Sequence, residues 1–230
     1  MASQLDVYNL ALTYLDISQT VQSLNDPTPT AGTLNRWYDW ARRKVLRDAW
    51  WDFATKTVAL ALLLDQATLT SQAQFMFPGW RYVYQRPIDS LRFLAVSTQY
   101  GIRINPYTRT WWYDQSQAPQ WGPYRPPWRE AIDTIQTPAG SAIDILTDQD
   151  AAWGIYTVDV TNTGIWSEAF QEAVAWNLAV PCAGPLSANQ NAKKNAIVMA
   201  RQSINSALAV ELNQQQPDPY PESPAITARY

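Results

Sequence analysis

The spacing of apolar residues changes twice along this chain, and this change constrains its fold more than any other feature. Near both ends, apolar residues recur every three or four positions, the period of a helix that buries one face. Between about residues 56 and 162 they alternate every two positions, the period of a half-buried strand. This order predicts an α+β fold, in which the terminal helices form one bundle and a small antiparallel β-sheet or barrel is inserted between them.

Two helices are predicted before the strands. The first covers residues 3 to 17, and a proline-containing loop covers residues 18 to 32. Thr33 is then predicted to cap a second helix that runs to about Phe53. The residues expected on the inner face of this second helix are Leu34, Tyr38, Ala41, Val45, Ala49 and Phe53. The cations expected on a solvated face are Arg42, Arg43, Lys44 and Arg47.

The middle of the chain predicts short strands at residues 81–85, 92–96, 102–104, 142–146 and 155–160. The apolar run 58–64 fits either a strand or a helix end. Ser167 is predicted to cap a helix that ends near Val180, because Pro181 and Pro185 each remove a backbone donor. A last helix is predicted over residues 188 to 215. The stripe that it is expected to bury contains Ile197, Ala200, Ile204, Ala207, Leu208 and Leu212.

These elements divide the chain into three predicted parts. Residues 1–56 and 165–216 form the helical bundle domain, and residues 57–164 form the inserted β domain with a Pro/Trp-rich loop at 106–129. Residues 217–230 form an extended C-terminal arm, because their prolines fit neither helix nor sheet.

Composition excludes several classes of function. The chain has no histidine, which excludes Ser-His-Asp and Cys-His nucleophile systems and His-ligated zinc. Its net charge of −3 argues against tight, non-specific binding of phosphate backbones. No apolar run approaches the ~20 residues that cross a bilayer, and no secretory signal is recognised, so we expect a soluble protein made in the cytoplasm. Cys182, the single cysteine, is expected to pack as a small hydrophobe.

Carboxylates are the remaining candidates for chemistry, since two of them could hydrolyse a glycoside. Those in the β region are Glu130, Asp144, Asp148, Asp150 and Asp159, and their spacing selects no pair. A calcium loop at residues 147–150 lacks the glycine and the closing glutamate of the known pattern. No phosphate-binding or nucleophile motif occurs. We therefore expect no catalysis, no cofactor and no metal.

The loop 106–129 concentrates aromatic residues in a segment rich in proline. Its rings could anchor a protein interface, cover the chain's own sheet, or stack on sugars. The loop residues taken as interface candidates are Trp111, Trp112, Tyr113, Trp121, Tyr124 and Trp128. The C-terminal arm could be a disordered tail or a segment ordered on a neighbouring subunit. The arm residues taken as interface candidates are Pro217, Tyr220, Arg229 and Tyr230.

A succession of short motifs resembles a known family. The motifs are Asn9-Leu-Ala-Leu12, Tyr14-Leu-Asp-Ile17, Val21-Gln-Ser-Leu-Asn-Asp26, Tyr38-Asp39-x-Ala41-Arg42, Val45-Leu46, Trp50-x-Asp52-Phe53-Ala54 and Tyr84-x-x-Pro87-x-Asp89-x-x-Arg92. In this order they resemble the head-to-tail adaptor of short-tailed phages, the tail tubular protein A family, and related head-completion proteins. The resemblance spans about residues 5 to 96 and resumes more loosely over residues 167 to 215. Residues 106–129 and those after 216 depart from it.

The resemblance implies structural roles for the motif residues. Trp50, Phe53 and Ala54 would end the long helix and fill the gap between bundle and sheet. Asp89 would cap the turn after Pro87, and Arg92 would return to pair with Asp89. Tyr84 is a further structural residue of this motif.

The resemblance also implies partners and a location. It implies a homo-oligomeric ring of about twelve copies at the head–tail junction of a virion, between the portal protein and the tail nozzle or next tail protein. The helical part and the C-terminal segment would meet the portal, and the β part would meet the next tail protein. DNA would pass through the axial channel without specific binding, and no membrane is involved. A competing interpretation is a carbohydrate-binding module that stacks exposed Trp rings on glycans, and a weaker one is a glycan-cleaving enzyme.

Overall fold

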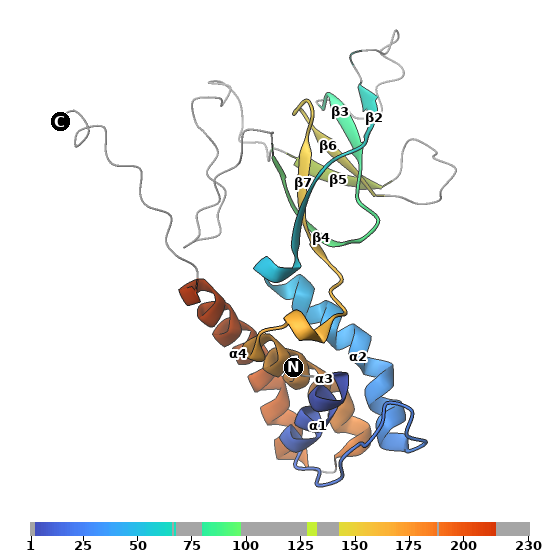
Figure 1. Cartoon of the computed structure of the whole chain (residues 1–230), viewed down its shortest axis with the longest axis vertical. Helices are drawn as coiled ribbons and strands as arrows, with labels where there is room; N and C mark the ends of the chain where they lie inside the picture. Colours follow the sequence, from blue (N-terminus) through green and yellow to red (C-terminus); the bar gives the residue numbers. More distant parts are fainter. Residues whose placement is uncertain are drawn as a thin grey trace, which may run out of the picture.

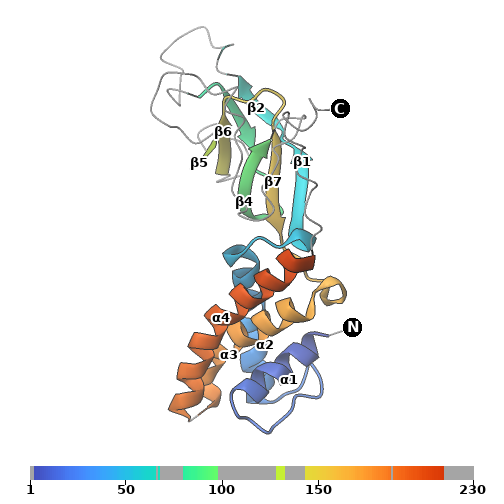
Figure 2. The same cartoon turned by 90° about the vertical axis from the view of Figure 1, so that its left-hand side faces the viewer.

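The computed structural model describes residues 3–65, 67, 80–97, 128–132, 143–187 and 189–214. Its fold is α+β, as predicted, with the helices at one end of an elongated molecule and the strands at the other (Figures 1 and 2). The helices are α1 (Gln4–Tyr14), α2 (Pro29–Asp48), α3 (Glu168–Leu186) and α4 (Gln190–Gln214). The strands are β1 (Thr55–Ala59), β2 (Leu62–Asp65), β3 (Tyr82–Gln85), β4 (Ser90–Ser97), β5 (Trp128–Ile132), β6 (Ile143–Thr147) and β7 (Trp153–Val158).

Helix α1 begins where the sequence predicts and ends one turn earlier. Ser3 and Asp6 form a capping box, in which Ser3 N–H donates to Asp6 Oδ2 at 2.7 Å and Asp6 N–H donates to Ser3 Oγ at 3.2 Å. The helix ends at Tyr14, and Asp16 then adopts a positive φ of 56°. The predicted end at residue 17 is therefore wrong by three residues.

Helix α2 starts earlier than predicted. Thr28 is its N-cap, accepting a hydrogen bond from Ala31 N–H at 3.3 Å, and Pro29 occupies the first turn. Proline is tolerated there because its missing donor would have no intrahelical acceptor. Thr33 is not the cap: it lies within the helix, and its Oγ1 donates to Pro29 O at 2.8 Å.

Helix α2 also ends earlier than predicted, at Asp48. The chain then forms a 3-10 turn (Asp52–Ala54), so Phe53 lies beyond the helix. The rest of the predicted inner face is confirmed. Its residues Leu34, Tyr38, Ala41, Val45 and Ala49 are buried, and Phe53 is half-buried.

Helix α3 continues through both prolines, so the predicted end near Val180 is wrong. Ser167 is the N-cap, as predicted, with its Oγ accepting from Phe170 N–H at 3.2 Å. Proline in a helix interior costs ~3 kcal/mol. Here the residues beside Pro181, namely Leu178, Ala179, Cys182 and Ala183, are fully buried, and their packing outweighs that cost.

Helix α4 buries a stripe of small residues. The buried residues are Ala192, Ala196, Ala200, Ser203, Ile204 and Ala207. Ile197, predicted to lie on the buried stripe, is 42% exposed. The residues that α4 buries are mainly alanines, and Ile204 of the predicted stripe is buried with them. Small side chains let two helix backbones approach closely.

All four helices share one hydrophobic core. Its largest buried side chains are Tyr8, Leu12, Leu15, Leu34, Leu46, Trp51, Phe170 and Leu178. Trp166 and Val160, from the segment that leads out of β7, also belong to this core. The two ends of the chain therefore fold against each other, although more than 100 residues separate α2 from α3.

The strands form two antiparallel sheets. One has the order β1-β7-β4 and the other the order β2-β3-β6-β5. The chain changes sheet between β1 and β2, where Leu60 N–H donates to Ala152 O and Gln85 N–H donates to Ala61 O, each at 2.9 Å. The apolar run 58–64 is thus neither one strand nor a helix end but the bend between two strands.

A second core lies between the two sheets. It contains Phe93, Val96 and Tyr156 from one sheet and Tyr82, Tyr84 and Ile145 from the other. Gly154 of β7 allows the close packing here, because a Cβ at this position would lie 2.6 Å from Leu60 Cδ2 and 2.9 Å from Phe93 Cε2.

The other strand predictions agree with the structure to within three residues at either end. The predicted strands at 81–85, 92–96, 142–146 and 155–160 correspond to β3, β4, β6 and β7. The predicted strand 102–104 lies outside the described residues. Strand β5 was not predicted, because Trp128 belongs to a sequence segment whose prolines indicate a loop.

Candidate interaction surfaces

Most of the predicted interface residues lie outside the described part of the chain, and for them the interface remains a prediction. These are Trp111, Trp112, Tyr113, Trp121, Tyr124, Pro217, Tyr220, Arg229 and Tyr230. Trp128 is described, and it does not project from a loop. It begins β5 and packs edge-to-face on Phe93, with the ring centroids 5.0 Å apart. Self-packing is the correct interpretation for this residue, since the ring covers the second core.

The predicted structural residues lie in the two cores and in the turn between β3 and β4. Tyr84 is buried in β3, and its hydroxyl donates to Gln149 O at 2.9 Å. Pro87 O accepts from Ser90 N–H at 3.1 Å, which closes the turn between β3 and β4. Phe53 packs edge-to-face on Phe170 of α3 at 5.0 Å. Each of these three residues has a structural contact in the described part of the chain, and the role that the resemblance implies for it in the adaptor family stays a prediction.

Trp51, and not Trp50, fills the core at the end of α2. The Trp51 ring is fully buried against Phe170, and its Nε1 donates to Val45 O at 2.8 Å. Trp50 is only half-buried. The helix ends at Asp48 rather than near Phe53, so the chain has already turned when it reaches this pair of tryptophans. Sequence spacing counted along a continuous helix therefore assigned the wrong ring.

Asp89 and Arg92 do not pair with each other. Asp89 accepts from Lys56 Nζ of β1 and from Tyr156 Oη of β7, each at 2.9 Å. Arg92 instead donates from Nη1 to Arg47 O at 2.7 Å, close to the C-terminal end of α2. A cation is favourable at this end of a helix, where backbone carbonyls lack partners. Arg92 therefore ties β4 to α2.

An ion-pair network that the sequence did not predict joins the helices to the strand end of β7. Arg42 Nε and Nη2 both donate to the Asp159 carboxylate at 3.0 Å, and Arg42 Nη1 donates to Asp39 Oδ1 at 2.7 Å. Arg43 Nε donates to Asp159 Oδ2 at 2.8 Å. Arg42 is buried, so its predicted place on a solvated face is wrong. Guanidinium and carboxylate meet in a fork geometry that suits a buried pair.

The same junction is closed by apolar contacts. Leu91 of β4 packs against the helical core, and Val158 of β7 packs against both cores. The contacts at this junction could not be predicted from the sequence, because Arg42 and Asp159 are 117 residues apart.

The carboxylates considered for catalysis have structural contacts. Asp148 Oδ1 accepts from Arg81 N–H at 2.9 Å, and Glu130 lies 3.4 Å from Arg86. Asp144 is buried in β6, and Asp150 accepts from Ala151 N–H in the turn before β7. In the described residues no three His, Cys, Asp or Glu side chains come close enough together to hold a metal ion.

Cys182 lies in the helical core, as predicted. Its side chain is fully buried in α3, and this burial raises the pKa of the thiol to about 12. A thiol with so high a pKa is a poor nucleophile at neutral pH.

Several large apolar side chains are exposed on the described surface. Ile88, at the tip of the turn between β3 and β4, is 97% exposed. Trp40 of α2 is 41% exposed and packs edge-to-face on Trp37 at 5.8 Å. The remaining exposed residues of this kind are Leu62, Ile143, Ile165, Ile197, Val198 and Val210. Single exposed apolar residues are common, so only those that share a face with others indicate an interface.

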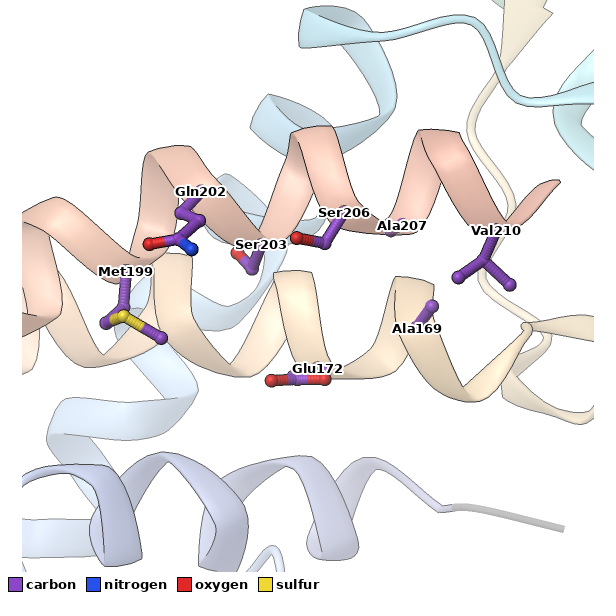
Figure 3. A pocket seen from close by; sticks show the side chains of 8 residues that line it. All are labelled: Ala169, Glu172, Met199, Gln202, Ser203, Ser206, Ala207 and Val210. Carbon is purple, nitrogen blue, oxygen red and sulfur yellow. The ribbon is translucent and has the colours of Figure 1, made fainter. Parts of the chain in front are cut away.

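A shallow groove runs between α3 and α4 (Figure 3). Its lining residues are Ala169, Glu172, Met199, Gln202, Ser203, Ser206, Ala207 and Val210. In Figure 3, Met199 extends from α4 toward α3, Glu172 lies at the edge of α3 that is turned to α1, and α1 runs beside α3 on the far side from α4. Trp176, one turn along α3 from Glu172, donates from Nε1 to Glu172 Oε1 at 3.4 Å and stacks on Tyr14 of α1 at 3.7 Å.

Comparison of the chain with models of known protein families and with curated proteins finds no match. In the part of the chain that the structure describes, none of the helices combines the length and the apolar character that spanning a bilayer requires.

Proposed function

We propose that this chain is a structural protein of a virion, a head-to-tail adaptor that forms a ring between the portal and the tail of a short-tailed phage. One observation carries the proposal: three of the motif residues that resemble the adaptor family, Arg42, Asp89 and Arg92, make their polar contacts at the junction between helices and strands. Arg42 binds Asp159 there, Asp89 binds Lys56 and Tyr156, and Arg92 binds the end of α2.

This convergence supports the proposal because it gives the motifs a shared physical task. A subunit placed between two large partners must transmit load from one end to the other without bending. Polar contacts and the bridging side chain of Val158 hold the helical part and the strand part of the molecule together. The motif residues therefore serve the shape of the subunit, which is what an assembly protein depends on.

The proposal includes a division of the subunit. The helical bundle domain of residues 1–56 and 165–216 would meet the portal together with the arm 217–230. The inserted β domain of residues 57–164 would meet the next tail protein. DNA would pass through the central channel, where an acidic chain avoids holding the phosphates that clustered lysines would retain.

The test is reconstitution with the portal protein of the same particle. We expect the mass of the complex, measured by native mass spectrometry, to correspond to a ring of this chain on the portal. A cryo-EM map of the native particle should show the chain at the vertex, and a map without it there would refute the proposal. Quenching of tryptophan fluorescence by oligosaccharides, with no binding to the portal, would favour the carbohydrate-binding alternative.

A further inference from the structure

Helix α4 presents a basic and apolar stripe on a different side from the groove. Lys193, Lys194, Ile197, Val198 and Arg201 are all exposed and are spaced so that they lie together on one face of the helix. Val198 is 62% exposed. In the described part of the chain, no carboxylate forms an ion pair with any of the three cations. We refer to these five residues as the α4 stripe.

The opposite side of the helical layer carries acidic and apolar groups and no cation. Neither α1 nor α3 contains a lysine or an arginine. Glu168 and Glu172 are exposed on α3, and the groove beside Glu172 is lined by Met199 and Val210 of α4. We refer to the groove together with Glu168 and Glu172 as the α3 groove.

The two surfaces lie on different sides of α4 and adjoin along one edge, where Val198 of the α4 stripe lies one turn from Gln202 of the groove. Two residues along a helix correspond to a rotation of about 200°, so Met199, which lines the groove, points away from Ile197 of the α4 stripe. One molecule can therefore use both surfaces at once, each with a different neighbour. This is the geometry of a head-to-tail contact, which makes a ring where the rotation between copies closes.

We propose that the α4 stripe of one copy of this chain docks in the α3 groove of a second copy. The charges select this occupant, since the three cations of the stripe would face the two glutamates of the groove, and Ile197 and Val198 would cover Met199 and Val210. The inference rests on the proposed function, because it names the surfaces by which the adaptor subunits associate.

The experiment uses charge reversal of the full chain in two variants. The stripe variant carries Lys194→Glu and Arg201→Glu, and the groove variant carries Glu172→Lys and Ser206→Lys. All four positions are exposed, so neither variant should unfold the chain, which circular dichroism would verify. Arg36→Glu is the control, because Arg36 is an exposed arginine of α2 outside both surfaces.

Sedimentation equilibrium measures the self-association. We expect the wild type to associate less at high salt, and each double variant to associate about tenfold or more weakly than the wild type. The Arg36→Glu control should match the wild type. An equimolar mixture of the stripe and groove variants should associate again. In the mixture, the acidic stripe of one variant meets the basic groove of the other, and the unchanged stripe meets the unchanged groove.

Two outcomes would overturn the inference. The first is a wild type that stays monomeric at about 100 μM at low salt. The second is an oligomer whose affinity is the same in both variants, which would place the contact on another face. Neither outcome decides the proposed function, which fails if a map of the native particle shows no copy of the chain at the vertex.

Discussion

Replacing Asp159 with alanine removes the carboxylate that holds Arg42 at the helix–strand junction. The Arg42 side chain is 5% exposed, and it would keep only its bond to Asp39. Leaving one member of a buried pair without its partner typically costs 3–5 kcal/mol. Because the Asp159 side chain is itself 24% exposed, we expect the lower end of this range, about 3 kcal/mol of unfolding free energy.

Asp39 provides a matched control, since its carboxylate binds the same guanidinium but is 66% exposed. Asp39→Ala should cost about 0.5 kcal/mol, the value typical of a solvent-exposed pair. For a chain of 230 residues, each kcal/mol corresponds to about 2–4 °C in melting temperature. Asp159→Ala should therefore lower the midpoint by about 6–12 °C and Asp39→Ala by no more than about 2 °C.

Urea unfolding monitored by circular dichroism would measure both free energies. The combined variant Arg42→Met/Asp159→Leu should recover most of the stability, because it removes the buried charge together with its partner. Equal losses for Asp159→Ala and Asp39→Ala would refute the argument, since they would show that burial does not distinguish the two carboxylates.

Three further predictions follow from particular side chains. Trp51→Ala should lower the free energy of unfolding by about 3–5 kcal/mol, because the ring is fully buried. Trp50→Ala, at a half-buried position, should lower it by about 1 kcal/mol. Comparable losses in urea unfolding would contradict the assignment of Trp51 as the core ring. Gly154→Ala should destabilise the chain by about 1–3 kcal/mol, because the new Cβ clashes with Leu60 and Phe93. Gly32→Ala in α2 should stabilise it by about 0.5–1 kcal/mol, because a Cβ there meets nothing within 4 Å. A change of melting temperature in the same direction for both variants would contradict this reasoning. The hydrogen bond between Lys56 and Asp89 lowers the pKa of Asp89 below its usual 3.8 and raises the pKa of Lys56 above its usual 10.5. The stabilisation that Lys56→Met removes should therefore be present between pH 3.8 and 10.5, and should fade as pH falls through the lowered pKa of Asp89 or rises through the raised pKa of Lys56. A difference in urea midpoint between wild type and variant that does not change between pH 3 and 7 would argue against the pair.

The class and the order of the elements could be predicted from the apolar spacing alone. Its period changes from 3.6 to 2 and back, and the structure has helices, strands and helices in that order. The cap at Ser167 was also predicted from local sequence, because a cap depends on residues three positions apart, whereas the cap predicted at Thr33 is at Thr28 instead. The inner face of α2 from Leu34 to Val45 was predicted correctly for the same reason, since a helical stripe is a local pattern.

The ends of the helices and the identity of the buried charged residues, in contrast, depend on tertiary packing. Packing of Leu178, Ala179, Cys182 and Ala183 carries α3 past Pro181, although local propensity predicts a break. The burial of Arg42 depends on Asp159, which approaches only when β7 returns to the helices. The choice of Trp51 over Trp50 depends on a chain that turns after Asp48. Local patterns give the elements because the forces that form them act over a few residues, whereas ends, junctions and buried charges depend on partners more than 100 residues away.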